Sequence, residues 1–273
     1  RIFLSPGPIF DPEDRMDDYW GYTEAFYSVG FRPGDVVQVT FNYHLTPAGL
    51  MFEEPLRNLG CASIPAGPTD PGTQLDIMQK LRVSGYVGTA SYLMHLAQKA
   101  EEKGINLRKD LFQEVAFVTG ERLSEKMRNQ LEKKFDIILR QGYGTADVGC
   151  IGYECFHRTG LHISNRCYVE ICHPDTGIPL KDGEVGEIVV TSFNKTYPLI
   201  RLATGDLSYI DRAPCACGRT SPRLGGIVGR VDTTARIKGM FVYPHQVEPG
   251  HGPLRGHPSA GRSRSSTPAA STR

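Results

Sequence analysis

The residues best suited to chemistry stand together in the stretch Gln141-Gly-Tyr-Gly-Thr-Ala-Asp-Val-Gly149, shortly after the apolar residues 137–139. Those apolar residues predict a buried strand. Gly142 and Gly144 predict a turn at which the backbone approaches a ligand closely or takes a positive φ. The pattern therefore indicates a binding site on a glycine-jointed turn at the end of a strand.

Three side chains of this stretch suit a nucleotide. The Tyr143 ring can cover a flat base, the Thr145 hydroxyl can hydrogen-bond a phosphate oxygen, and the Asp147 carboxylate can help to hold a magnesium ion. The structural alternative is a strand that ends in an ordinary glycine turn, since short motifs also match by chance.

Two later segments carry further polar groups. In Tyr197-Pro-Leu-Ile-Arg-Leu-Ala-Thr-Gly-Asp206-Leu, a carboxylate follows an apolar run, where Asp206 can accept hydrogen bonds from both hydroxyls of a ribose. The segment Gly229-Arg-Val-Asp-Thr-Thr-Ala-Arg-Ile-Lys-Gly239 follows closely.

Taken together and in this order, the three segments resemble the acyl-adenylate-forming ligases. The stretches Tyr153-Glu-Cys155, Gly160-Leu-His162, Pro198-Leu-Ile-Arg201 and Gly239-Met-Phe-Val-Tyr-Pro-His-Gln-Val-Glu248 narrow the resemblance to the phenylacetate-CoA ligase-like family. The similarity runs from about Arg1 to Glu248.

The resemblance implies an enzyme that uses ATP, Mg²⁺ and coenzyme A. A carboxylate is joined to the α-phosphate, pyrophosphate leaves, and the CoA thiolate then displaces AMP to give an acyl-CoA thioester. Positioning and neutralisation of charge dominate the first of these steps.

The resemblance also implies roles for single residues. Within the motif that starts at Gln141 and Gly142, Tyr143, Gly144 and Thr145 would contact adenine and the α-phosphate, and Asp147 would bind the magnesium ion. Gly120 and Glu121 would border the adenine, and Asp206 would bind the ribose. Arg230 and Asp232 would lie at a hinge, and Lys238 would lie where the pantetheine arm of CoA enters. For Arg230 and Lys238, a solvated charged loop is the alternative.

Tyr43 and His44 lie where this family forms its acyl pocket. An aromatic wall there would suit an aryl acid. A Tyr and a His after a strand can equally be packing residues with a satisfied polar end.

Three departures from the family pattern bear on activity. The region that matches the phosphate loop is Ser5-Pro-Gly-Pro-Ile-Phe-Asp-Pro12, in which prolines lack N–H donors and no Thr or Lys remains to hold pyrophosphate. Asp147 stands where the family has glutamate. The lid domain, which supplies a lysine for adenylation, is not expected within the chain. We therefore expect a fragment that is a poor catalyst.

The cysteines raise a separate hypothesis. Cys155 and His162 flank a tight turn, and Cys215-Ala-Cys217-Gly218 forms another, so three thiolates and one imidazole could converge on a zinc ion. His157 competes with His162 as the fourth ligand. The alternative is that all four side chains are structural, as we expect for the remaining cysteines, Cys61, Cys150, Cys167 and Cys172.

Composition limits the class of protein and its partners. The 273 residues are 40% hydrophobic and 22% charged, as in ordinary globular proteins, and residues 249–273 carry four of the 31 basic residues and no acidic one. No basic stripe favours nucleic acid, and no apolar run could span a membrane. Seven cysteines, an odd number, favour a reducing, cytoplasmic location. The sequence leaves a homodimer open.

Alternation of strand and helix patterns predicts the fold class. We expect an α/β fold like the large domain of an adenylate-forming ligase, with a mainly parallel sheet, helices on both faces and a β-rich subdomain after it. The expected helices are 19–29, 46–59 with a kink or break near Pro55, 73–81, 92–103 and 124–135; the expected strands are 2–4, 35–41, 61–64, 85–89, 115–119, 136–139, 167–172, 186–191 and 207–210.

Four parts of the chain follow from this reading. They are an α/β core at 1–160, a β-rich subdomain with the possible zinc site at 161–228, a hinge to the lid at 229–248, and a disordered tail at 249–273 whose composition resembles an out-of-frame translation. The predicted function is an AMP-forming ligase that activates an aryl or other small carboxylic acid. The alternatives are an impaired nucleotide- or acid-binding protein and a zinc-stabilised domain derived from such a ligase.

Overall fold

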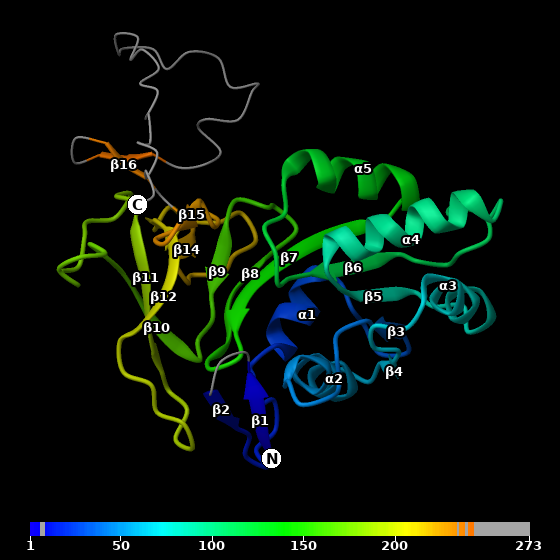
Figure 1. Cartoon of the computed structure of the whole chain (residues 1–273), viewed down its shortest axis with the longest axis horizontal. Coiled ribbons are helices and arrows are strands. Elements are labelled where there is room, and N and C mark those ends of the chain that lie inside the picture. The colour runs from blue at the N-terminus through cyan, green and yellow to red at the C-terminus, as the bar shows by residue number, and fades with distance from the viewer. Residues whose placement is uncertain (6–8, 234, 238–239, 243–273) are drawn as a thin grey trace, which may run out of the picture. The chain divides into compact units, whose positions relative to one another are not determined.

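The computed structural model describes residues 1–5, 9–233, 235–237 and 240–242 (Figure 1). Residues Arg1–Asp232 form one compact unit, and a second unit begins at Thr233. In the second unit, two short strands pair in antiparallel fashion, β16 (Ala235–Ile237) and β17 (Met240–Val242). Lys238 and the tail expected at 249–273 lie outside the residues that the structure describes.

A nine-stranded mixed sheet organises the first unit, in the order β13-β14-β9-β8-β7-β6-β5-β3-β4. Five neighbouring strands at one end are parallel. They are β3 (Val36–Val39), β4 (Ala62–Pro65), β5 (Gly85–Gly88), β6 (Val115–Val118) and β7 (Ile138–Thr145). Every residue of β5 and β6 is buried, which explains why these strands read as continuous apolar or small-residue runs.

Helices cover both faces of this parallel half (Figure 1). One face carries α1 (Thr23–Val29) and α2 (Ala48–Asn58), and the other carries α3 (Pro71–Lys80), α4 (Ala90–Glu102) and α5 (Glu125–Phe135). Asp70, Thr89 and Ser124 cap the N-termini of α3, α4 and α5 by accepting hydrogen bonds from backbone N–H groups.

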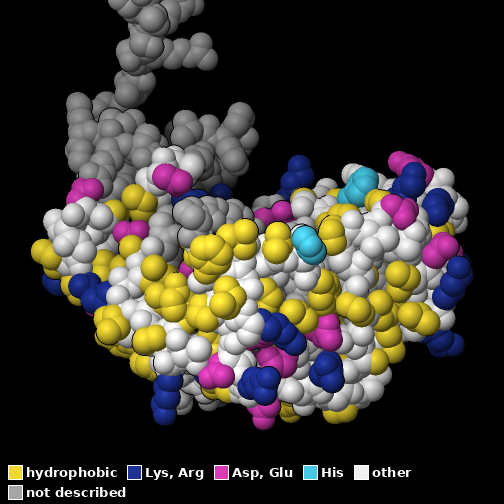
Figure 2. All heavy atoms as spheres, turned by 60° about the horizontal axis from the view of Figure 1, so that its bottom comes forward, with side chains coloured by type: hydrophobic (Ala, Val, Ile, Leu, Met, Phe, Trp, Pro, Cys, Tyr) yellow, Lys and Arg dark blue, Asp and Glu magenta, His cyan; other side chains and the backbone are white. Residues whose placement is uncertain are grey.

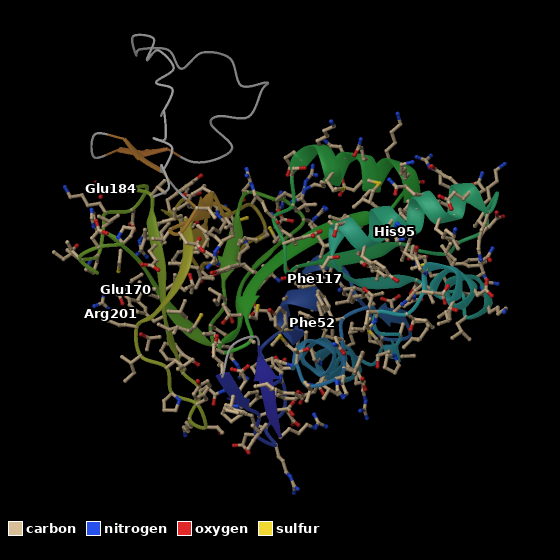
Figure 3. All side chains as sticks on the ribbon, in the orientation of Figure 1. Phe52, His95, Phe117, Glu170, Glu184 and Arg201 are labelled. Carbon is tan, nitrogen blue, oxygen red and sulfur yellow. The ribbon has the colours of Figure 1, made fainter. Side chains whose placement is uncertain are left out.

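Aromatic rings fill the core beneath α1 and α2. The fully buried Phe117 of β6 meets Phe26 of α1 edge to face, with ring centroids 5.0 Å apart, and lies 6.3 Å from Phe52 of α2 (Figure 3). Ring pairs in such tilted arrangements stabilise the fold beyond the effect of burying their apolar surface. This aromatic cluster holds β6 in place, and it thereby positions the loop that starts near Gly120.

The other half of the nine-stranded sheet is antiparallel. It consists of β8 (Gly149–Glu154), β9 (Leu161–Ile163), β14 (Arg223–Leu224) and β13 (Ile210–Asp211). Strand β7 belongs to both halves, since it pairs with β6 in parallel and with β8 in antiparallel fashion. The sheet is therefore mixed rather than mainly parallel, and it crosses the expected division at residue 160.

A second, four-stranded antiparallel sheet follows in the order β10-β11-β12-β15. Its strands are β10 (Cys167–Cys172), β11 (Gly186–Ser192), β12 (Leu202–Ser208) and β15 (Gly229–Arg230). Glu170 of β10 and Arg201, just before β12, form an ion pair at 3.1 Å on this sheet (Figure 3). The β-rich texture predicted after residue 161 is confirmed in this sheet.

Two helices differ from the expectation. The helix expected from Tyr19 begins at Thr23 instead, because Gly21 has a φ of 73° and the rings of Tyr19 and Trp20 are buried in the core. The break expected near Pro55 is absent, since α2 continues through this residue to Asn58.

An N-terminal hairpin of β1 (Ile2–Ser5) and β2 (Ile9–Pro12) exposes Ile2, Leu4, Ile9 and Phe10. Hydrophobic side chains gather on the side of the molecule that lies at the bottom of Figure 1, as Figure 2 shows. Among the described helices, none has the length and apolar character that crossing a membrane would need.

Candidate functional site

Three of the predicted nucleotide-site residues converge between the two sheets. The Tyr143 hydroxyl on β7 donates a hydrogen bond of 2.9 Å to Oδ2 of Asp206 on β12, and Nη1 of Arg230 on β15 donates one of 2.8 Å to Oδ1. Asp206 and Arg230 are paired directly across the ladder between β12 and β15. The Asp206 carboxylate is therefore held from two sides.

The pKa values of Tyr143 and Arg230 are both raised at this site. Burial raises the pKa of Tyr143 well above its usual range, and the Asp206 carboxylate raises it further. The Asp206 carboxylate is also the largest cause of the raised pKa of Arg230. Tyr143 thus remains a neutral donor and Arg230 a cation, so both present hydrogens to the carboxylate at ordinary pH.

A glycine beside Asp206 makes room for Arg230. Gly205 has a φ of 77°, and a Cβ at this position would lie 2.9 Å from Nη2 of Arg230. Its N–H donates to Oε1 of Glu187 on β11 at 3.0 Å. Any other residue at 205 would be strained at this positive φ, and its Cβ would crowd the end of the Arg230 side chain.

Gly142 and Gly144 allow close packing inside the protein. A Cβ on Gly142 would overlap the Phe117 ring, and one on Gly144 would overlap the backbone of Gly149 and the Tyr22 hydroxyl. Neither has a positive φ, so that expectation for these two glycines was wrong, and their close approach to a ligand stays a prediction. The stretch continues β7 as far as Thr145, and the turn comes later, at residues 146–148.

Thr145 and Asp147 lie at this turn. Oγ1 of Thr145 accepts a hydrogen bond of 3.1 Å from the N–H of Val148, which leaves the hydroxyl proton able to point elsewhere. Burial raises the pKa of Asp147, and the neighbouring Asp11 carboxylate raises it further. Two adjacent carboxylates are a ligand set that Mg²⁺ prefers, so Asp147 at this turn and Asp11 on β2 fit the ion implied by the resemblance.

Gln141 is tied to a buried ion pair that sequence reasoning missed. Its N–H donates to Glu154 at 2.9 Å, and its side-chain amide donates at 3.1 Å. Glu154 in turn receives two hydrogen bonds, of 2.9 and 2.7 Å, from the Arg128 guanidinium, which is only 1% exposed. The sequence does contain a sign that Arg128 is buried. Arg128 shares helical spacing with Leu131 and Phe135, so it falls on the buried face of α5.

Gly120 and Glu121 follow β6 as expected. Gly120 has a φ of 83° and approaches the Phe41 ring and Thr89. The Glu121 carboxylate accepts hydrogen bonds of 2.5 and 2.8 Å from the N–H and hydroxyl of Ser91, in the first turn of α4. Glu121 therefore holds the N-terminus of that helix in place.

The two expected acyl-pocket residues differ in setting. Tyr43 is half-buried, packs against the aromatic core and covers Gly49, where a Cβ would overlap its ring. His44 is exposed. A hollow of about 480 Å³ near α2 is lined by Glu53, Glu54 and Arg57 among others, and none of the predicted site residues that the structure describes lines it.

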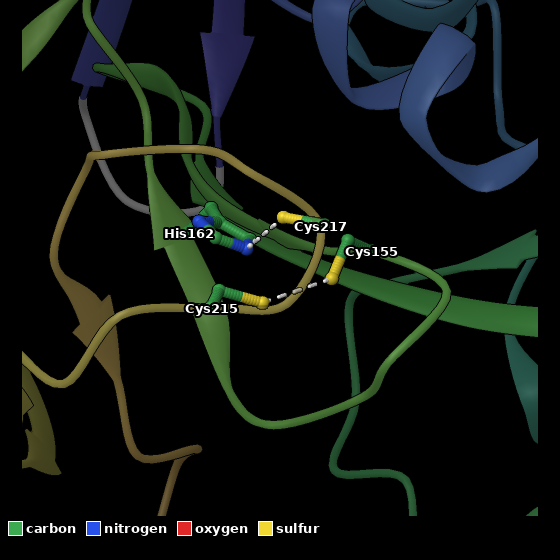
Figure 4. Close-up of side chains that lie close together, drawn as sticks. All are labelled: Cys155, His162, Cys215 and Cys217. Atoms are coloured by element: carbon green, nitrogen blue, oxygen red, sulfur yellow. Dashed lines mark hydrogen bonds between the residues drawn. The ribbon is translucent and has the colours of Figure 1, made fainter.

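The four predicted zinc ligands come together in the antiparallel half (Figure 4). Sγ of Cys155 lies 3.7 Å from Sγ of Cys215, and Sγ of Cys217 lies 3.3 Å from Nε2 of His162. All four ligand atoms lie within 4.8 Å of one another. His162 is fully buried, whereas its competitor His157 is exposed and does not join the group.

The thiols of this cluster differ in acidity. Burial raises the pKa of Cys155 to about 11. Burial also acts to raise the pKa of Cys215, but hydrogen bonds, first from the N–H of Cys217 and then from the Thr159 hydroxyl, outweigh it and lower that pKa to about 5.

Comparison with known proteins gives consistent matches. A family described as AMP-binding enzyme matches residues 19–195. The phenylacetate-coenzyme A ligase of Thermus thermophilus is 33% identical over 226 residues, which cover 81% of this chain and 51% of that protein. Its counterpart from Escherichia coli is 30% identical over 244 residues, which cover 85% and 54%. The chain thus spans about half the length of these relatives.

Solved structures of adenylate-forming ligases share the fold. An open conformation of 2-hydroxyisobutyryl-CoA ligase in complex with 2-HIB-AMP and CoA superposes with a TM-score of 0.82 at 25% identity, covering 89% of this chain and 60% of that one. ATP-bound MatB from Rhodopseudomonas palustris gives 0.62 at 19% identity, covering 84% and 47%, which supports the fold alone. The predicted α/β fold class and the predicted resemblance are confirmed.

Proposed function

The chain belongs to the AMP-binding enzyme family, and from this premise we propose that it is part of an AMP-forming acid–CoA ligase. The reaction proposed for the whole protein has two steps. A carboxylate oxygen attacks the α-phosphorus of ATP and pyrophosphate leaves; the CoA thiolate then attacks the acyl carbon and AMP leaves.

The observation that carries the proposal is the convergence of Tyr143 and Arg230 on Asp206. Each oxygen of a carboxylate has two lone pairs, so the two hydrogen bonds leave one acceptor site on each oxygen. Two vicinal ribose hydroxyls present donors at a spacing that such a pair of oxygens can accept. We propose that Tyr143 and Arg230 fix the orientation of Asp206 for this purpose, with Arg230 at the hinge.

We propose that the turn after β7 receives the phosphates. The Thr145 hydroxyl would donate to an α-phosphate oxygen, since its oxygen already accepts from Val148. Asp147, beside Asp11, would hold Mg²⁺. The ion, when bound, neutralises negative charge on the phosphates. Gln141, Gly142 and Gly144 would support this turn through β7, and Gly120 and Glu121 would border the base from the end of β6.

The acid is proposed to be aryl or otherwise small. Support comes from the matched relatives, which are phenylacetate-coenzyme A ligases, and from the aromatic residues near Tyr43. Tyr43 would form part of the pocket wall, and the exposed His44 its rim. We further propose that CoA binds near Lys238, that the protein is located in the cytoplasm, and that it forms a homodimer.

A binding protein without turnover is the second candidate. Prolines at positions 6, 8 and 12 of the phosphate-loop region favour it, because proline has no N–H to donate to a phosphate oxygen.

Calorimetric titration separates the two candidates. The chain is titrated with AMP and with ATP plus Mg²⁺, each with and without phenylacetate, and acyl-CoA formation is assayed after addition of CoA. Asp206→Asn should weaken AMP binding roughly 10- to 100-fold, since hydrogen bonds to a charged group contribute about 1.5–3 kcal/mol. Asp182→Asn is the matched control, because Asp182 is an exposed partner of Arg212 on a different loop.

Binding of AMP that Asp206→Asn weakens and Asp182→Asn does not would support the site, and acyl-CoA formation would support the ligase. AMP binding without acyl-CoA formation would favour the second candidate. A folded chain that binds neither nucleotide would overturn both.

A further inference from the structure

The cluster of Cys155, His162, Cys215 and Cys217 has the dimensions of a tetrahedral metal site. Ligand atoms at about 2.3 Å (sulfur) and about 2.0–2.1 Å (nitrogen) from a tetrahedral zinc ion are about 3.8 Å apart for two sulfurs and about 3.6 Å apart for sulfur and nitrogen. The corresponding separations are 3.7 Å between the Cys155 and Cys215 sulfurs and 3.3 Å between Cys217 and His162. The side chains thus already surround a space of the right size.

The backbone holds the ligands in pairs. Cys155 directly follows β8, and His162 lies on the neighbouring strand β9. The other pair stands on the Cys215-Ala-Cys217-Gly218 turn, which Gly218 closes with a φ of 84° and an N–H donated to the Cys215 carbonyl at 3.0 Å. Two pre-formed turns therefore face each other, and little ordering is left for a metal to impose.

The imidazole is oriented for metal binding. Nδ1 of His162 lies 3.2 Å from Oγ of Ser221, while Nε2 points to the Cys217 sulfur. If Nδ1 donates to the serine oxygen, Nε2 carries the free lone pair that a metal ligand needs. A partner that fixes the tautomer in this way is typical of metal-bound histidine.

Polar neighbours can offset the charge of the thiolates. Three thiolates and a divalent ion have a net charge of about −1. The Arg223 guanidinium interacts electrostatically with Cys215, and the Arg219 guanidinium interacts electrostatically with Cys217. Arg223 also donates to the Thr159 hydroxyl at 2.7 Å, and that hydroxyl lies 3.6 Å from the Cys215 sulfur. The environment therefore suits an anionic metal–thiolate centre.

We propose that Cys155, His162, Cys215 and Cys217 bind one zinc ion in a closed structural site that joins the β8–β9 turn to the loop before β14. Three sulfurs and one imidazole nitrogen in a tetrahedron are a ligand set that zinc takes in structural sites. The site has no open position, and none of the proposed nucleotide ligands belongs to it. The proposal does not depend on the proposed ligase activity.

Metal analysis of the whole chain tests the site. The chain is purified without chelator, passed over a desalting column and measured by inductively coupled plasma mass spectrometry. We expect about one zinc ion per chain. His162→Ala should lose this zinc, and the matched variant His157→Ala should keep it, because His157 is exposed and outside the cluster.

Cobalt substitution keeps the test decisive if His162→Ala fails to fold. The metal-free wild-type chain is titrated with Co²⁺, which gives visible bands typical of tetrahedral coordination and ultraviolet bands from sulfur-to-cobalt charge transfer. We expect both, saturating at about one equivalent, with loss of the bands on addition of zinc. Cys61→Ala, which removes a buried thiol elsewhere in the fold, should give the same spectrum.

Two results would overturn the proposal. One is a folded, zinc-supplemented chain that contains no zinc after desalting and gives no tetrahedral cobalt spectrum. The other is a Cys155–Cys215 disulfide, detected by mass spectrometry, in chain purified under reducing conditions with zinc present. Neither result depends on nucleotide binding, so failure here is distinct from failure of the proposed function.

Discussion

The two halves of the nine-stranded sheet are stabilised in different ways. In the parallel half, β3, β5 and β6 lie between two layers of helices, and apolar clusters fill both faces. In the antiparallel half, β13 and β14 are two residues long, and buried polar, charged and thiol groups, among them His162, Glu154 and Cys155, lie among the strands.

This difference shows where each half obtains its stability. Helices on both faces of a parallel sheet bury enough apolar surface to hold it. Two-residue strands contribute few ladder bonds, so in the second half specific polar contacts add to an apolar cluster that includes Ile151, Leu161 and Leu224. A buried ion pair or a metal cluster is sensitive to loss of a single partner, whereas an apolar layer loses stability by increments.

The largest expected effect comes from the Arg128–Glu154 pair, which connects α5 to the antiparallel half. Arg128→Ala leaves the Glu154 charge buried without its partner and should reduce the free energy of unfolding by about 3–5 kcal/mol. Urea unfolding measures this change. Lys99→Ala, which removes the exposed pair with Glu102, should cost only about 0–1 kcal/mol.

A compensating variant sharpens this prediction. Arg128→Met combined with Glu154→Gln removes both charges and keeps an acceptor for the Gln141 N–H, so most of the lost stability should return. If the double variant is no more stable than Arg128→Ala, the cost lies in packing, and the contrast between the two halves would be weaker than proposed.

Removal of zinc should have a smaller and more local effect. After treatment with a strong chelator, amide hydrogen exchange in β9 and β14 should become at least about 100-fold faster, which corresponds to about 3 kcal/mol of local stability. Exchange in β5 and β6 should change little, since neither strand contacts the cluster. Uniform acceleration in all strands would mean that the halves unfold as one unit.

The smallest effect is expected from a helix cap in the parallel half. Asp70→Ala removes the carboxylate that accepts from the N–H groups of Gly72 and Thr73, and should lower the free energy of unfolding by about 1 kcal/mol. Thermal unfolding measures it, with Asp76→Ala as the control on the same helix, whose carboxylate makes only a surface pair with Lys80. A loss as large as that of Arg128→Ala would contradict the incremental view of this half.

Sequence patterns predicted the parallel half well, because strands and helices long enough to show a period alternate there. Helix α5 was expected from residue 124 and begins at Glu125, with Ser124 as its cap. Strands β9 and β14 were not predicted, since two or three residues show no period, and the strand expected at 207–210 covers the end of β12 and the start of β13. The turn predicted in the Gln141–Gly149 stretch lies at residues 146–148, after Gly142 and Gly144, because pairing with β8 extends β7 through both glycines.

The chemistry was predicted unevenly. The four cysteine and histidine positions of the cluster were identified because metal ligands come in pairs on tight turns, and the structure brings those four together. The hydrogen bonds from Tyr143 and Arg230 to Asp206 were not foreseen, since they join strands of different sheets. The packing roles of Gly142 and Gly144 depend on Phe117 and Tyr22, which no local pattern connects to them.

The shared strand β7 also has a consequence for the order in which the chain acquires its structure on the ribosome. All strands and helices of the parallel half have been made once residue 145 has emerged, so this half can form early. Tyr143 must then wait for Asp206, made 63 residues later, and Cys155 for Cys215, made 60 residues later. A nascent chain therefore presents a formed scaffold well before its proposed nucleotide and zinc sites exist, and neither ligand can assist the first stage of its folding.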